Sequence, residues 1–443
     1  MGIGTGIWYE YGMQKNPMRA VENRSGRFTS GLAAAMLALT LAAAVAQAQD
    51  VRFFRLQAET NSEITEFSSS GDFAWSNPAA AGRFQVQWIA DPANGVWLDY
   101  LSGPVTGTQH RVRLFADDAP DGMAYIPAGD FVMGDSWGGD TTALPVHGVW
   151  VSAFYMDRRT VTKELWDEVR SWGLTNGFTD LAEGAGGGVR TAEVVTNEGV
   201  VVTNWLYSAA GPEHPVVLIN WYDMVKWCNA RSLYDGLDPV YYLDGGFSEL
   251  YQTGVVDLAN SQVDWAGEGY RLATESEWEK AARGGLVQHH YPWPSYGLPL
   301  SNYINRTQLN YLGSGDAYEA GTTPPGYYDG SQVVTNDLGE VLPAEDMANA
   351  YGLYDMAGDV WEFCWDIFSP TGYQWRVDSG NLTDPHGPTY IDLTIRRVDR
   401  GGSWLTGSNS VADARTGVRY WAVPSAAHYG HNRGFRTVRR AGE

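Results

Sequence analysis

Long apolar runs, cysteine and positive charge are scarce in this 443-residue chain. After residue 45 no uninterrupted stretch approaches the 18 or so apolar residues that a membrane helix needs, so we expect no membrane span. Only two cysteines occur, Cys228 and Cys364, and the sequence leaves open whether they form a disulfide or stay free. With 30 Lys+Arg against 52 Asp+Glu, the net charge of −22 disfavours nucleic acid and anionic membranes as partners.

The N-terminus has the features of a targeting segment. Three arginines between residues 19 and 27 precede an apolar run over residues 32–45, and the triplet that ends at Ala48 fits a small-x-small cleavage site. We therefore expect residues 1–48 to be a leader and signal peptide, cleaved near Ala48, and the protein to be periplasmic or extracellular. Because the first seventeen residues have no place in such a signal, we hypothesise that translation begins at Met18.

The mature chain divides by texture into two parts. Residues 49–117 alternate apolar and polar residues in short runs between turn clusters, which predicts a small antiparallel β module. Residues 118–443 are rich in glycine and tryptophan and mix short strands with three expected helices, opening at Thr160 and covering residues 220–232 and 273–285. Residues 180–212 look like a surface insertion. The sequence predicts an irregular, loop-rich α+β fold.

Seven ordered segments carry a resemblance to a known family. They are YIPAGDFVMGD, FYMDRRTVTKELWDEV, HPVVLINWYDMVKWCNARS, GYRLATESEWEKAARGG, NAYGLYDMAGDVWEFCWD, RVDRGGSW and NRGFRTVRR. In this order, over roughly residues 122–440, the chain resembles the sulfatase-modifying-factor family, whose namesake is the formylglycine-generating enzyme. The resemblance implies a C-type-lectin-like fold for this part of the chain, whereas the β module lies outside it.

Residues 351–366, YGLYDMAGDVWEFCWD, combine Asp355, Asp359 and Glu362 with glycines that break any regular period. Calcium prefers several carboxylate and carbonyl oxygens of this kind, so we expect a structural calcium site. The resemblance implies the side chains of Asp355 and Glu362 with the carbonyls of Gly358 and Val360 as its ligands.

A second calcium site is implied by the same resemblance. Its ligands would be the side chains of Asn302 and Asp316 and the carbonyls of Tyr303 and Tyr318. The alternative for both sites is that these acidic residues merely cap turns or face solvent.

The resemblance fails where the family's chemistry is centred. Formylglycine-generating enzymes bind copper(I) with two cysteines after the RGGS motif, and the matching positions here are Thr406 and Val411. Neither side chain offers the thiolate that copper(I) selects, so we expect no copper site and no confident catalytic residue.

Other residues of the family's pocket are retained, and we expect them to contact a peptide, a carbohydrate or a small molecule. They are Trp361, Ser403, Trp404, Arg419, Trp421 and Arg436. For Trp361, Trp404 and Arg436 a core or capping role is the alternative that we favour.

The sequence thus favours a calcium-stabilised binding scaffold, with residues 404–433 as its recognition surface. An oxidoreductase of the formylglycine-generating or sulfatase-maturation type with altered metal ligands is the main alternative. A structural component of an envelope assembly is a third possibility.

Overall fold

The structure of the protein is a computed structural model that describes most of the chain after residue 50. The described residues are 9–12, 51–58, 63–67, 72–76, 81–89, 98–106, 109–114, 119–197, 200–293, 304, 306–318, 320–388, 395–406, 411–425 and 431–442. The predicted signal peptide and its cleavage site at Ala48 lie outside them, whereas β1 (Tyr9–Gly12) falls within the predicted leader.

Two antiparallel sheets form the N-terminal part, as the alternating pattern predicts. Strands β3, β4 and β7 make one sheet, and β1, β2, β5 and β6 continue into β9 and β10 in a six-stranded sheet. The strands are β2 (Val51–Ala58), β3 (Glu63–Phe67), β4 (Asp72–Ser76), β5 (Ala81–Ile89), β6 (Leu98–Thr106), β7 (Gln109–Arg113), β8 (Met123–Ile126), β9 (Gly129–Met133) and β10 (His147–Val151).

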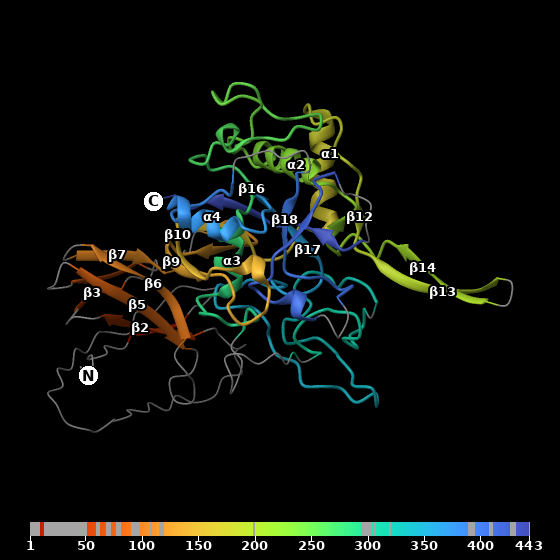
Figure 1. The fold of residues 1–443 in the computed structure, drawn as a ribbon, viewed down its shortest axis with the longest axis horizontal. Helices are drawn as coiled ribbons and strands as arrows, with labels where there is room; N and C mark the ends of the chain where they lie inside the picture. Colours follow the sequence, from red (N-terminus) through yellow and green to blue (C-terminus); the bar gives the residue numbers. More distant parts are fainter. Residues whose placement is uncertain are drawn as a thin grey trace.

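The larger sheet runs across residue 117, where the sequence suggested a boundary. Ser102 of β6 pairs with Asp130 of β9, and Figure 1 shows the two sets of strands side by side. One apolar core also joins both parts, since Trp75 and Val86 belong to the same cluster as Trp278. The β module is therefore packed on the rest of the protein rather than set apart from it.

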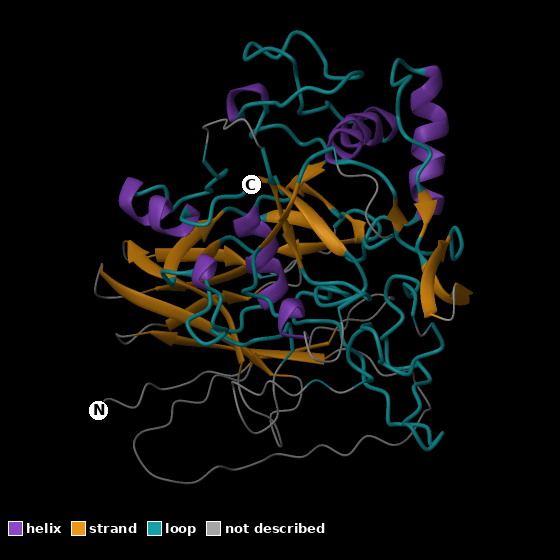
Figure 2. Cartoon of the chain, turned by 45° about the vertical axis from the view of Figure 1, so that its right-hand side comes forward, coloured by secondary structure: helices purple, strands orange, loops and turns teal. Residues whose placement is uncertain are grey.

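The described residues of the remaining chain hold four α-helices among short strands and long loops (Figure 2), which confirms the irregular α+β architecture. The helices are α1 (Lys163–Thr175), α2 (Trp221–Tyr234), α3 (Glu275–Arg283) and α4 (Gly372–Ser379), with 3-10 turns η1 (Thr141–Ala143), η2 (Asn260–Gln262) and η3 (Val411–Ala414). The strands are β11 (Phe154–Asp157), β12 (Ala185–Gly186), β13 (Val189–Asn197), β14 (Val200–Ser208), β15 (Val216–Val217), β16 (Arg271–Leu272), β17 (Trp361–Ile367), β18 (Arg397–Arg400), β19 (Tyr420–Ala422), β20 (Arg433–Gly434) and β21 (Thr437–Arg440).

Local sequence signals set the ends of three helices. Thr274 caps α3 through a capping box with Glu277, and Gly284 ends it in a left-handed conformation with φ 54°. Asn220 forms a second capping box at α2, and Thr162 caps α1. The surface insertion is confirmed as the β13–β14 hairpin, which projects from the body of the protein in Figure 1.

Helix α3 is buried on all sides, its charged residues included. Its glutamates are paired instead of solvated. Glu279 accepts hydrogen bonds from Arg400 at 2.6 Å, from Arg283 at 2.6 Å and from the Tyr373 hydroxyl at 2.9 Å. Burial of these charges is tolerated because each one meets an opposite charge in good geometry.

The C-terminal sheet, in the order β19-β18-β17-β20, lies between two apolar cores. Cys364 and Val398 face the core shared with the N-terminal sheet, while Phe363 and Ala422 face the core that holds α1 and α2. Alternation along the strands therefore sorts the side chains of this sheet onto two faces. The candidate site forms where this sheet begins.

Candidate functional site

The acidic motif at residues 351–366 folds as a tight turn that leads into β17. Asp355 and Asp359 both have left-handed backbones, with φ 55° and 57°. Gly358 has φ 85°, and a Cβ there would clash with the carbonyl oxygen of Asn310. Glycine is thus required between the two aspartates, and the turn holds their carboxylates near one another.

Among the described residues, the two aspartates accept hydrogen bonds only from the backbone. Asp355 Oδ2 accepts from the N–H of Gly326 at 2.6 Å, and Asp359 Oδ1 accepts from the N–H of Thr323 at 3.0 Å. Asp359 Oδ2 is buried and has no hydrogen-bond partner in the same part of the chain. An unpaired buried carboxylate oxygen is costly, and a bound cation is one partner that would remove the cost.

The electrostatics of the turn also favour a bound cation. Burial raises the pKa of Asp355 to about 6, and the charge of Glu362 adds to this rise. A backbone hydrogen bond and nearby arginines oppose it. Burial, followed by the negative charge of Asp355, raises the pKa of Asp359 well above its ordinary range. Burial therefore makes ionisation of both carboxyl groups costly, and a bound cation would lower that cost.

The third carboxylate, Glu362, is engaged by the protein itself. Its Oε2 accepts from Trp278 Nε1 at 2.7 Å, and Arg436 donates to both carboxylate oxygens at 2.6 and 2.8 Å. Glu362 and Arg436 are both buried. The ligand role implied for Glu362 remains a prediction, and Asp359, to which the resemblance gave no role, has the oxygen without a partner.

In the described part of the chain, no three His, Cys, Asp or Glu side chains are arranged to hold a metal ion. A calcium ion at this turn would therefore depend on backbone carbonyls for much of its coordination. The predicted ligand set, with the carbonyls of Gly358 and Val360, has this character.

The second predicted calcium site is seen only in part. Asn302 and Tyr303 lie outside the described residues. Asp316 is buried and satisfied by the protein, since its carboxylate accepts from Ser314 Oγ, Tyr328 OH and the N–H of Tyr318, each at 2.7 Å. The structure thus gives this set less support than the turn at Asp355.

The positions of the family's cysteine pair hold no thiol. Thr406 is buried, and its Oγ1 accepts from the N–H of Ser403 at 3.2 Å. Val411 begins η3. Cys228 and Cys364 are both free and lie in different cores, so the question of their pairing is answered, and burial raises the pKa of each thiol.

Three of the six predicted pocket residues, Trp361, Ser403 and Trp404, contact residues 431–432, and the others have different partners. The N–H of Trp361 donates to the carbonyl of Asn432 at 2.8 Å, and Ser403 Oγ accepts from Asn432 Nδ2 at 3.3 Å. Arg419 is bound by Glu275 at 2.6 Å, and Trp421 packs beneath the sheet on the face of Val398. Trp404 is fully buried, and its Nε1 donates to the carbonyl of His431 at 3.0 Å. Together with the Arg436–Glu362 pair, this geometry favours core roles for Trp404 and Arg436.

Trp361 lies on the other face of this sheet and has different neighbours. It stacks on Tyr420 of β19, with ring centroids 5.2 Å apart, and Tyr420 is 47% exposed. Strand register places Arg433 beside Trp361 and Asp399 beside Tyr420. Arg433 Nε donates to Asp399 Oδ2 at 2.7 Å, and among the described residues its side chain makes no other hydrogen bond.

This group of four takes one residue from each strand of the sheet, and we call it the candidate binding edge: Trp361, Asp399, Tyr420 and Arg433. Sequence reasoning found Trp361 but missed the other three, because only the strand register brings them together. The sequence offered one signal, since Tyr420 and Arg433 both lie within residues 404–433, the expected recognition surface.

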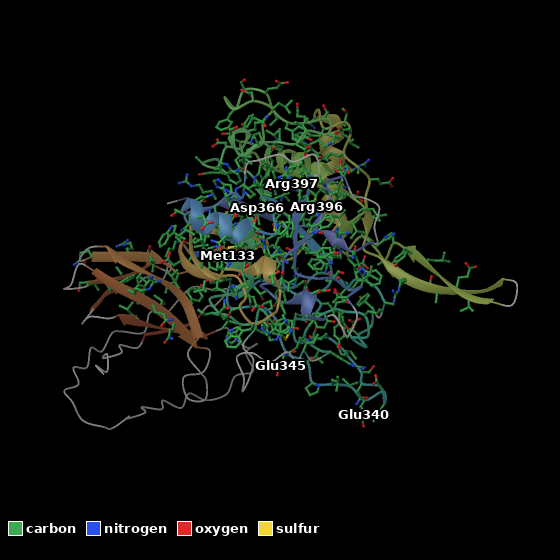
Figure 3. All side chains as sticks on the ribbon, viewed as in Figure 1. Met133, Glu340, Glu345, Asp366, Arg396 and Arg397 are labelled. Carbon is green, nitrogen blue, oxygen red and sulfur yellow. The ribbon has the colours of Figure 1, made fainter. Side chains whose placement is uncertain are left out.

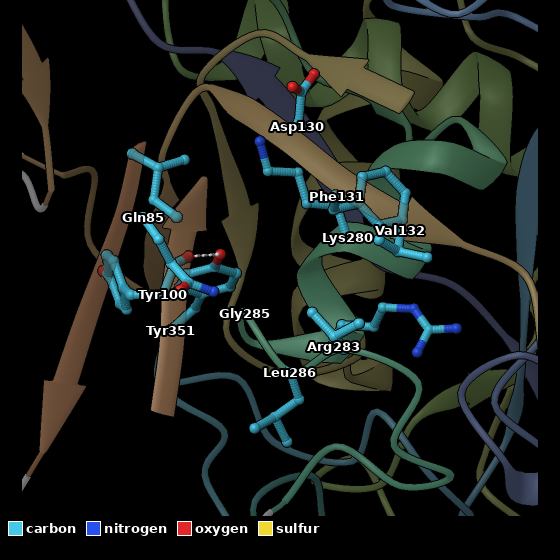
Figure 4. A pocket seen from close by; sticks show the side chains of 12 residues that line it. Gln85, Tyr100, Asp130, Phe131, Val132, Lys280, Arg283, Gly285, Leu286 and Tyr351 are labelled. Atoms are coloured by element: carbon cyan, nitrogen blue, oxygen red, sulfur yellow. Dashed lines mark hydrogen bonds between the residues drawn. The ribbon is translucent and has the colours of Figure 1, made fainter. Parts of the chain in front are cut away.

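A small pocket lies elsewhere, between β6, β9 and α3 (Figure 4). Lys280 lines it and extends from α3 toward Asp130. Its Nζ donates to the carbonyls of Gly129 and Val151 at 2.8 and 3.1 Å, and burial lowers the pKa of this amine to about 7. Through these two carbonyls Lys280 joins α3 to strands β9 and β10.

Among the residues that the structure describes, no helix is long and apolar enough to cross a bilayer.

Comparison with known proteins identifies the larger part of the chain. Residues 110–441 match the sulfatase-modifying factor enzyme 1-like domain. A formylglycine-generating enzyme of Streptomyces coelicolor is 26% identical over 347 residues, which cover 72% of this chain and 90% of that protein. The inactive C-alpha-formylglycine-generating enzyme 2 of Mus musculus is 28% identical over 340 residues, covering 74% and 90%.

Among solved structures, variable protein 1 of Treponema denticola is similar, with 26% identity and a TM-score of 0.44. The similarity covers 72% of this chain and 95% of that one.

Proposed function

Because this chain belongs to the sulfatase-modifying factor family, we propose that it is an exported, non-catalytic member that acts as a calcium-stabilised ligand-binding scaffold. One observation carries the proposal: the positions of the copper-binding cysteine pair hold Thr406 and Val411. The chain's only two thiols lie apart in apolar cores. Without thiolates at the centre, copper(I) has no soft ligands there.

The role of calcium is to stabilise the turn before β17. Asp355, Asp359 and the carbonyls of Gly358 and Val360 are the groups that would hold the ion. A divalent cation supplies the positive charge that the aspartates lack, and it would hold loops that have few backbone ladders of their own.

Ligand recognition belongs to the candidate binding edge. Tyr420 offers an exposed aromatic face backed by Trp361, and Arg433 offers N–H donors held in place by Asp399. Aromatic faces and a positioned guanidinium suit a sugar, a peptide or another small ligand. Tyr207 of the β13–β14 hairpin is a second exposed aromatic residue, and its ring stacks on His431 with centroids 5.8 Å apart. His431 lies two residues before Arg433 in the chain.

Metal analysis of protein purified without chelator tests the proposal. Stoichiometric calcium with no copper or iron is expected, whereas a bound redox metal would favour the altered oxidoreductase. Asp355→Asn should lower the Tm in calcium and remove the response to EGTA, because the substitution deletes a ligand charge.

Asp329→Asn, at an exposed aspartate in the same region, serves as the matched control. If EGTA shifts the Tm of Asp355→Asn as much as that of the control, the calcium site is refuted. Glu362→Ala is less useful, because loss of the Arg436 partner would destabilise the protein with or without calcium.

A further inference from the structure

Arg397, on β18, is a buried cation that forms no ion pair with any described carboxylate. Its side chain is 1% exposed, and its Nη1 donates to the carbonyl of Trp365 at 2.6 Å. The guanidinium carbon lies 3.6 Å from the ring centroid of Trp221. Nε is buried and has no hydrogen-bond partner among the residues that the structure describes. Cation–π contact and one carbonyl thus replace the usual ion pair.

Other buried arginines of the same region are paired. Arg400 meets Glu279 at 2.6 Å, and Arg436 meets Glu362 at 2.6 Å. Within the described residues no ion pair includes Arg397. Burial of a charge without a counter-charge costs several kcal/mol, so the position of Arg397 calls for a bound anion.

The charges of two carboxylates, Asp257 and Asp366, act on Arg397, but both carboxylates bond to other groups. Asp257 accepts from the Tyr222 hydroxyl at 2.7 Å. Asp366 Oδ2 accepts from the N–H of Glu275 at 2.7 Å, and Oδ1 lies 3.8 Å from Arg376. Figure 3 labels Asp366 and Arg397 in the centre of the molecule, next to Arg396.

A pocket opens beside this guanidinium. It is a small recess that is partly open to solvent, and its lining includes Leu258, Asn260, Trp365, His386, Pro388 and Arg397. Asn260 Oδ1 accepts from Trp365 Nε1 at 2.7 Å, which leaves the amide N–H₂ as a donor. His386 stacks on Trp265, with centroids 3.6 Å apart.

We propose that this pocket binds a carboxylate group, with Arg397 and Asn260 as donors and Trp365 as an apolar wall. One cation and a narrow, partly apolar lining suit a planar monoanion better than a phosphate dianion. A polyanion would also be repelled by the net charge of −22. This site is separate from the candidate binding edge and does not depend on the proposed function.

Thermal unfolding in sodium acetate, compared with sodium chloride at equal ionic strength, tests the proposal. We expect a Tm that rises with acetate and saturates, because acetate binds only the folded protein. Arg397→Gln should raise the acetate concentration that gives half of the Tm increase by about tenfold or more, the loss expected for a charged hydrogen bond. Arg396→Gln is the matched control and should leave this concentration unchanged, since the Arg396 guanidinium lies over Trp421, outside the pocket.

Asn260→Asp keeps the test decisive if Arg397→Gln does not fold. A carboxylate built into the pocket should supply the missing counter-charge and abolish the acetate response. A short peptide with a free or an amidated C-terminus then distinguishes two natural ligands. Binding of the free peptide but not the amidated one identifies a peptide carboxylate as the ligand. Binding of acetate but of neither peptide identifies a small free acid. No saturable acetate effect, or an equal effect in Asn260→Asp, would overturn the proposal.

Discussion

Replacement of Glu279 by glutamine removes the negative charge at the centre of the buried network around α3. Its carboxylate accepts from Arg283, Arg400, Tyr373 and the N–H of Gly134. A glutamine amide keeps the shape but offers only one acceptor oxygen. Arg283 loses its counter-charge, and Arg400 keeps only Glu275, at 3.4 Å. The variant should therefore be destabilised without a change of fold.

Two independent arguments give the size of this loss. Removal of one partner from a buried ion pair typically costs about 3–5 kcal/mol. The charges of Arg283 and Arg400 outweigh the cost of burial and lower the pKa of Glu279 from 4.5 to about 2. At about 1.4 kcal/mol per pKa unit, this shift contributes about 3 kcal/mol to stability.

The sign of the pH dependence follows from the lowered pKa. The Glu279 contribution is fully present above pH 4.5 and is lost as the pH falls toward 2. Urea unfolding of the wild type and Glu279→Gln, followed by tryptophan fluorescence, should show a difference near 3 kcal/mol at pH 7 that shrinks below pH 4.5. Glu268→Gln, at an exposed loop glutamate, should change stability by less than about 0.5 kcal/mol. A Glu279→Gln protein as stable as this control at pH 7 would refute the reasoning.

Two further predictions concern buried groups whose pKa values are shifted. Cys228 and Cys364 should not react with a thiol reagent in the native protein and should both react in urea, because both thiols are buried and their pKa values are raised; rapid native labelling of either would contradict this. Between pH 7 and 9 stability should rise, since Lys280, with its pKa lowered to about 7, releases on folding a proton that the unfolded chain still binds. Lys280→Met should flatten that rise in urea unfolding, and an unchanged slope would exclude Lys280 as its source.

Local signals in the sequence predicted local structure well. The capping box of Thr274 and Glu277 and the left-handed Gly284 follow from residues within ten positions of one another. The β13–β14 insertion was also visible from composition. These features depend on short-range backbone chemistry, which a sequence states directly.

Features that depend on strand register were not predictable in this way. Arg436 and Glu362 are 74 positions apart, and their ion pair forms only once β17 and the C-terminal strands are in place. The same holds for Asp399 and Arg433, which are 34 positions apart. The sequence placed Arg436 among the pocket residues but favoured a core or capping role for it, and its burial and its bond to Glu362 agree with that role.

The retained scaffold explains why the resemblance was easy to find and the chemistry hard to infer. Trp404, Arg436 and Glu362 hold the fold together, so they identify the family without implying its reaction. Thr406 and Val411 alone decide whether the family's copper chemistry is available.

The most direct test of the account is conversion of a cysteine in a sulfatase-derived peptide to its aldehyde. The purified protein, incubated with copper(I), dioxygen and the peptide, is expected to yield no aldehyde by mass spectrometry, while a formylglycine-generating enzyme run in parallel does. Aldehyde formation by this protein would contradict the account and establish it as an oxidoreductase.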